Sequence, residues 1–117
     1  MEKSTNMVEL QAKHMQGVID HLNSSMRQTK EYYLETYKRL PPKVVELEMF
    51  TEKVIKLVRY LPNESTDSIE VKLARLKEKI ERFSDDYKVY VLNNLVRAYE
   101  VELIYRRAHR GQQITHR

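Results

Sequence analysis

The sequence has 117 residues, 41% of them apolar and 32% charged, and it contains no cysteine. This length corresponds to one domain with its own hydrophobic core, and the lack of cysteine excludes disulfides, thiolate zinc sites and cysteine nucleophiles. The net charge is +4, and the four arginines among the last thirteen residues account for all of it, which excludes a uniformly basic domain.

Residues that favour turns are scarce along the whole chain. It has two glycines and three prolines, whereas a strand-rich domain needs a turn about every 8–12 residues, with glycine, asparagine or aspartate to form it. The composition therefore predicts an all-α fold built from long helices.

The first predicted helix runs from about Ser4 or Thr5 to Arg39. Apolar residues recur there at steps of three and four, which is the period of an amphipathic helix. The stretch Asn23–Ser25 is its weak point, because asparagine and serine cap helices better than they propagate them. We expect one long helix, with a break at Asn23–Ser25 as the alternative.

Two prolines separate this helix from the next. Pro41 disfavours a helical conformation at Leu40, and Pro42 suits the first turn of a new helix. The second predicted helix then has an apolar face that includes Leu47, Phe50 and Val54, and Pro62 ends it.

The third helical stretch begins near Asp67, which can cap it, with Glu70 reaching back as in a capping box. A nearly strict heptad pattern, as in a coiled coil, follows from Ile69 to Tyr90 and shifts phase by one added four-residue step at Asn94. We expect a nearly continuous helix, with a fresh start at Ser84 as the alternative. The prediction is thus a bundle of three long helices, or four if such a break occurs.

Residues 89–105 are apolar at twelve of seventeen positions, which is more than one amphipathic stripe requires. A helix of this kind is covered on most sides, and two other helical segments offer too little cover. We therefore expect this helix to be central and shared in a homodimer. The expected interface residues are Tyr87, Tyr90, Val91, Leu95, Tyr99 and Leu103.

Basic residues form two candidate contact regions for nucleic acid or an acidic partner. Those of the third stretch recur at three- and four-residue steps, and those of the C-terminal end surround a potential helix stop at Gly111. Guanidinium groups suit phosphates, but cations at a helix C-terminus also simply favour the helix dipole, and charged stripes commonly border a helix seam. The candidate residues are Lys72, Arg75, Lys79, Arg82, Arg106, Arg107 and Arg110.

No pattern of catalytic or cofactor-binding residues stands out. His14 and His21 are seven residues apart, whereas helical metal ligands are usually separated by three or four, and no nucleotide-binding or protease motif is present. We expect no enzyme activity, no cofactor and no metal. No apolar run approaches the about 20 residues of a membrane span, and the first residues lack a signal-peptide pattern, so we expect an intracellular protein of the cytoplasm or nucleus.

Together these patterns predict one helical domain over residues 1–110 and a flexible basic tail over residues 111–117. The leading functional hypothesis is a non-enzymatic interaction or regulatory module that acts through protein–protein contacts as a homodimer. The alternative is a small nucleic-acid-associated protein that binds the phosphate backbone through the basic helix stripe and the arginine-rich tail.

Overall fold

The computed structural model describes the backbone of residues 2–115 and the side chains of residues 9–108. The side chains of Arg110 and of the predicted tail therefore lie outside the described residues. The whole of residues 2–115 is helical apart from short turns, and it contains no strand. The all-α prediction is confirmed.

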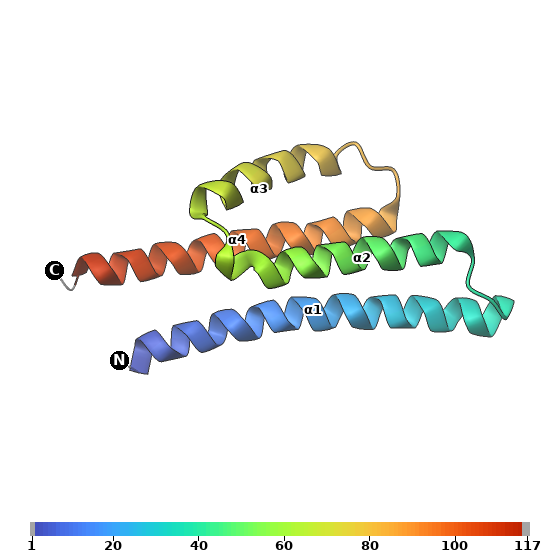
Figure 1. Ribbon diagram of the computed structural model, residues 1–117, viewed down its shortest axis with the longest axis horizontal. Helices are drawn as coiled ribbons and strands as arrows, with labels where there is room; N and C mark the ends of the chain where they lie inside the picture. Colours follow the sequence, from blue (N-terminus) through green and yellow to red (C-terminus); the bar gives the residue numbers. More distant parts are fainter. Residues whose placement is uncertain (1, 116–117) are drawn as a thin grey trace.

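Four α-helices form an elongated bundle of 62 × 31 × 17 Å (Figure 1). They are α1 (Glu2–Tyr37), α2 (Pro42–Tyr60), α3 (Thr66–Ile80) and α4 (Asp86–Thr115). A single 3₁₀ turn, η1 (Leu61–Asn63), follows α2 directly. Successive helices run in opposite directions, and both ends of the chain lie at the same end of the bundle.

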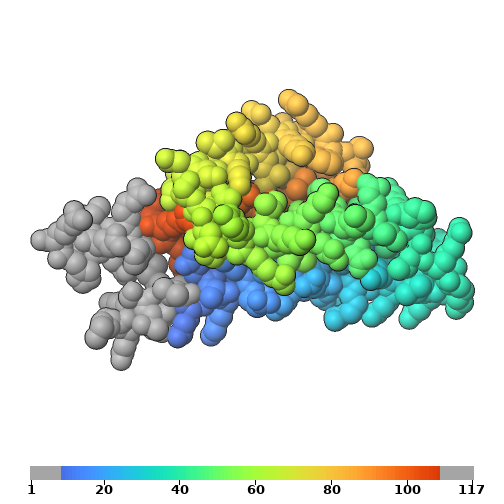
Figure 2. All heavy atoms as spheres, viewed as in Figure 1, coloured from blue at the N-terminus to red at the C-terminus, as the bar shows by residue number. Residues whose placement is uncertain are grey.

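The helix α4 packs against α1, α2 and α3. In Figure 2, α2 and α3 cover most of α4 on the face in view. The main core draws on all four helices, and Leu22, Val58, Ile69 and Val91, one from each, have no exposed surface. The central position expected for the last helix thus agrees with the packing inside one chain.

The expectation of a nearly continuous third helix was wrong, and the alternative of four helices is correct. The chain leaves α3 after Ile80 and begins α4 at Asp86. The cap is Asp85 rather than Ser84, because its Oδ1 accepts hydrogen bonds from the backbone N–H groups of Tyr87, at 2.9 Å, and Lys88, at 3.1 Å. The break folds α3 back along α4, so that one apolar sequence stretch buries itself against the other.

The start of α3 also differs from the prediction. Ser65 caps this helix, because its Oγ accepts a hydrogen bond from the backbone N–H of Ser68 at 3.1 Å. Asp67 instead lies in the first turn, where its charge favours the positive end of the helix dipole.

The helix α1 is continuous through Asn23–Ser25. Leu22 and Met26, on either side of this stretch, are both buried, and their packing outweighs the weak helix propensity of the polar residues between them. The double proline separates α1 from α2 as predicted, with Pro41 extended and Pro42 in the first turn of α2, but α1 ends at Tyr37, two residues before the predicted Arg39, and Lys38 takes a φ of 60°.

Candidate interaction surface

The α4 residues expected at a subunit interface lie mostly inside a single chain. Val91, Leu95, Tyr99 and Leu103 are between 0% and 5% exposed, while Tyr87 and Tyr90 are half-buried against the same core. The prediction of a shared helix assumed that only two other helices could cover α4. The break at Asp85 makes α3 a separate helix, and α3 is the third helix that packs on α4. A second copy could not contact the four buried side chains unless the bundle opened.

The basic stripe on α3 is partly used within the fold. Lys72 Nζ lies 2.6 Å from Glu64 Oε1, and Ser68 donates to the other oxygen of the same carboxylate at 2.6 Å. The hydrogen bond from Lys72, followed by that from Ser68, lowers the pKa of Glu64, and the same pairing raises the pKa of Lys72. Lys72 therefore helps to close the turn before α3, and its charge is paired within the chain.

The other cations of the stripe are directed outward. Arg75, Lys79 and Arg82 are exposed, and none of the three takes part in an ion pair with another described residue. The Nζ of Lys79 lies 5.9 Å from the centre of the Phe83 ring, a cation–π arrangement. These three residues are the part of the predicted basic stripe that remains exposed and unpaired among the described side chains.

Arg106, predicted as a phosphate contact, is bound within the bundle. Its Nε donates to Glu102 Oε2 at 2.7 Å, its Nη1 to Thr66 Oγ1 at 3.1 Å, and its Nη2 to the carbonyl oxygen of Leu61 at 2.9 Å. Glu102 is 2% exposed and also accepts a hydrogen bond from Gln11. This buried polar cluster joins α1, η1, α3 and α4.

Arg107 lies apart from the α3 stripe. It lines a shallow cavity between α3 and α4 together with Lys77, Arg97 and Glu100, and Lys77 and Glu100 form an ion pair at 3.1 Å. Lys72, in contrast, approaches Glu64 and Tyr60 near the end of α2. The structure therefore does not bring the predicted basic residues together into one continuous surface.

Exposed apolar side chains are concentrated where α1 turns into α2. We call residues 30–49 the hairpin tip. Among the side chains described, ten large apolar ones are exposed, and five of them belong to this segment. They are Tyr32 (56% exposed), Leu34 (45%), Tyr37 (55%), Val45 (42%) and Met49 (57%).

The hairpin tip has a small core of its own, formed by Met26, Val44 and Leu47. Tyr33 packs on this core and also contacts two aromatic neighbours: Tyr32 meets it edge-on at 5.4 Å between ring centres, and Tyr37 stacks on it at 5.6 Å. In Figure 1 the tip extends past the start of α4, so α4 does not cover its outer end. Tyr32, Tyr33 and Tyr37 lie close together in the sequence itself, whereas the exposure of Val45 and Met49 is seen only in the folded chain.

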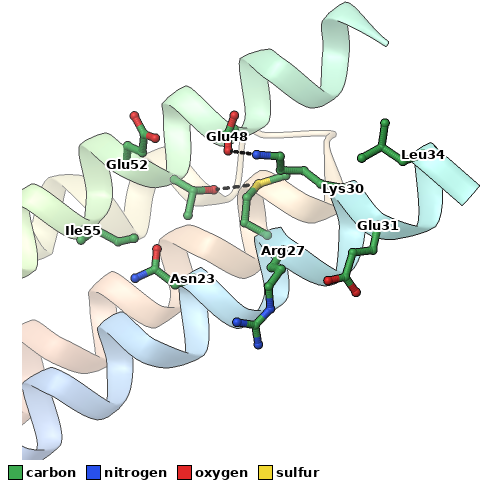
Figure 3. A pocket seen from close by; sticks show the side chains of 10 residues that line it. Asn23, Arg27, Lys30, Glu31, Leu34, Glu48, Glu52 and Ile55 are labelled. Carbon is green, nitrogen blue, oxygen red and sulfur yellow. Dashed lines mark hydrogen bonds and ion pairs between the residues drawn. The ribbon is translucent and has the colours of Figure 1, made fainter. Parts of the chain in front are cut away.

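A cleft of about 250 Å³ runs between α1 and α2 at the base of the hairpin tip (Figure 3). We call it the α1/α2 cleft. Met26 and Ile55 form its apolar floor with Thr51, whose hydroxyl donates to the carbonyl oxygen of Leu47 at 2.8 Å. Its rim is charged, and Lys30 Nζ reaches across it to Glu48 Oε2 at 2.6 Å.

The two walls of the α1/α2 cleft differ in charge. The α1 wall contributes Arg27 and Lys30 beside a single acid, Glu31, whereas the α2 wall contributes the two acids Glu48 and Glu52. Figure 3 shows Arg27 and Glu52 on opposite helices, with their charged ends turned away from each other. Neither residue forms an ion pair with another described side chain. The sequence analysis did not single out these rim residues, because the pairing of α1 with α2 brings them together.

Within the described part of the chain, no three His, Cys, Asp or Glu side chains come together as a set of metal ligands. Burial lowers the pKa of His14, and the nearby charge of Arg97 lowers it further, while the ring of His21 contacts the hydroxyl of Tyr90. None of the helices described is both long and apolar enough to cross a membrane.

Searches against protein-family models, curated proteins and solved structures find no match to this chain.

Proposed function

We propose that this protein is a helical interaction module that binds another protein through its hairpin tip. The observation that carries the proposal is the concentration of exposed apolar side chains on residues 30–49, which hold half of those found among the described side chains. Single exposed apolar residues are ordinary on any surface, but a local group of them marks an interaction site in many proteins.

The residue types at the tip suit protein recognition. Tyr32 and Tyr37 can bury a ring while the hydroxyl stays hydrated, and Met49 is a flexible apolar side chain that adapts to the shape of a partner. Tyrosine and methionine are both enriched at protein interfaces. The tip core of Met26, Val44 and Leu47 is already closed, so folding does not account for the exposed group.

The proposal moves the binding surface away from α4. A homodimer through the predicted α4 interface would have to displace α1, α2 or α3, because the bundle already buries Val91, Leu95, Tyr99 and Leu103 and leaves only Tyr87 and Tyr90 half-exposed. Self-association at the hairpin requires no such opening, because the exposed apolar side chains are accessible in the folded chain.

Nucleic-acid binding is the second candidate, and one observation favours it. Arg75, Lys79 and Arg82 are exposed at three- and four-residue steps along α3, a spacing that lets a helix place its cations along a phosphate backbone. Lys72 and Arg106 are engaged inside the fold, which leaves this surface with fewer available charges than the sequence suggested.

A photo-crosslinking amino acid at Met49 tests the leading proposal in an extract of cells that express the chain. The matched control places the same group at Val71, which is 49% exposed on α3 and lies outside the hairpin tip. We expect a defined protein adduct from position 49 that is absent from position 71. The same adducts from both positions, or none from position 49, would contradict the proposal.

A measurement of DNA duplex binding distinguishes the nucleic-acid hypothesis from the protein-binding proposal. A protein that neutralises several phosphates loses orders of magnitude in affinity between about 50 mM and about 200 mM salt. We expect no appreciable binding of a random DNA duplex in fluorescence anisotropy at either salt concentration. A steep salt dependence that disappears in the Arg75→Ala/Lys79→Ala/Arg82→Ala variant would instead favour nucleic-acid binding.

A further inference from the structure

We propose that the face of the α1–α2 hairpin that bears the α1/α2 cleft binds a second copy of this chain, around a two-fold axis that runs along the cleft. The inference rests on the proposed function, because it names one protein partner for the same hairpin. The order of charges along the two walls and the exposed apolar residues at one end favour this arrangement.

Residues of opposite charge occupy the two walls of the cleft at successive levels. Lys30 on α1 lies opposite Glu48 on α2, and this pair is in contact. One turn further from the tip, Arg27 and Glu52 line the same cleft. In two antiparallel helices at a fixed register, residues that lie opposite each other have residue numbers with a nearly constant sum. That sum is 78 for Lys30 and Glu48 and 79 for Arg27 and Glu52, so the two pairs belong to one register.

The signs reverse at the far end of the same face. A second cleft of about 280 Å³ continues between α1 and α2, lined by Gln16 on α1 and Arg59 near the end of α2. The exposed Asp20 accepts a hydrogen bond from Gln16 at 2.8 Å and supplies an acid to the α1 side there. The α1 side therefore carries Arg27 and Lys30 near the tip and Asp20 further away, and the α2 side carries Glu48 and Glu52 near the tip and Arg59 further away.

A two-fold axis along the cleft makes this pattern complementary to itself. This rotation places α1 of one copy opposite α2 of the other. Each residue keeps its position along the length of the cleft. Arg27 of one copy then faces Glu52 of the other, and Asp20 faces Arg59. Complementary charges of this kind favour one docked orientation and suppress others.

The apolar residues at the tip distinguish this axis from one that crosses the cleft. Leu34 and Val45 follow at the next level outward from Lys30 and Glu48 in the same register, and they are 45% and 42% exposed. The axis along the cleft brings both tips to the same end, so that Leu34 of each copy meets Val45 of the other and apolar surface is buried. A crossing axis would place the tip of one copy against the opposite end of the other.

The size of the face indicates a weak dimer. Residues from Met15 to Leu34 give it a length of about 30 Å at 1.5 Å per residue, and two helices side by side give it a width of about 20 Å. About 600 Å² from each copy corresponds to the lower end of specific interfaces, near 1,200 Å² in total. We expect dissociation at low concentration and at high salt.

Charge reversal tests the pairing across the two copies. By light scattering after size exclusion at tens of micromolar, we expect the wild-type chain to elute as a dimer of its 14.1 kDa subunit. Arg27→Glu alone and Glu52→Arg alone should each raise the dissociation constant at least about tenfold, because each creates two like-charge contacts. Mixing the two variants should restore a dimer, since every contact between them is again of opposite sign.

Lys53→Glu is the matched control, because Lys53 is exposed on α2 next to Glu52 but does not line the cleft. It should leave the dimer unchanged, and far-UV circular dichroism should show that all variants are folded. A wild-type monomer, a mixture that fails to associate, or an equal loss in Lys53→Glu would each overturn the inference. An adduct at position 49 together with a monomeric wild-type chain would reject the dimer and leave the proposed function standing.

Discussion

Removing the guanidinium group of Arg106 is expected to destabilise the protein strongly. The group donates one hydrogen bond each to Glu102, Thr66 and the carbonyl of Leu61. Glu102 is 2% exposed, and a buried carboxylate that loses its partner costs about 3–5 kcal/mol. Arg106→Met keeps an unbranched side chain at this position but removes the only ion-pair partner of Glu102 among the described residues and leaves its carboxylate with the hydrogen bond from Gln11. We therefore expect a loss of about 3–5 kcal/mol, a large part of the about 5–15 kcal/mol that stabilises a typical domain.

Urea denaturation followed by far-UV circular dichroism measures this loss. Arg107→Met is the matched control at the neighbouring exposed position, and it should change the free energy of unfolding by no more than about 0.5 kcal/mol. The double variant Glu102→Leu/Arg106→Met should recover much of the loss, because it removes the buried charge together with its partner. A single Arg106→Met variant within about 1 kcal/mol of wild type would refute the reasoning, since that is the value of a surface ion pair.

Two further predictions concern the cap of α4 and the core. Asp85→Ala should lower the free energy of unfolding by about 1 kcal/mol, because the backbone N–H groups of Tyr87 and Lys88 lose their acceptor. The hydrogen bond from Lys88 lowers the pKa of Asp85 below 3.8 in the folded chain, so its contribution is present above that pH and is lost as the pH falls through the lowered pKa. Urea titrations at neutral and acidic pH should show a weaker dependence in Asp85→Asn than in wild type, with the remainder due to groups such as Glu64, and an unchanged dependence in that variant would exclude Asp85 as a source. Leu22→Ala should cost about 2–5 kcal/mol, whereas Leu34→Ala, at an exposed position, should cost no more than about 0.5 kcal/mol. Calorimetry would contradict this assignment of the core if both variants lost similar stability.

The repeat of apolar residues was sufficient to predict the buried face of α1. Met15, Leu22 and Met26 follow the helical period, and all three are buried. Pro41 and Pro42 likewise indicated the break after that helix, although the helix ends at Tyr37, two residues before the predicted Arg39. These predictions depend on interactions between residues a few positions apart, and such interactions are visible in a sequence.

The break before α4 could not be decided in the same way. A cap such as Asp85 contributes about 1 kcal/mol, which is comparable to the helix propensity lost over a few polar residues. The packing of α3 back onto α4 breaks this near balance, because Ile69 and Leu76 become buried in the resulting core. The same packing covers the α4 residues that looked like a subunit interface.

The sequence by itself determined the all-helical character of the chain and the apolar face of its first helix, because both follow from local spacing. The tertiary structure decided which charged and apolar groups remain accessible. Arg106 meets Leu61 and Thr66, which are 45 and 40 residues away, and this contact converts an expected phosphate ligand into part of the buried cluster. Burial and pairing over such separations depend on how the helices pack, and the order of residues along one helix does not specify that packing.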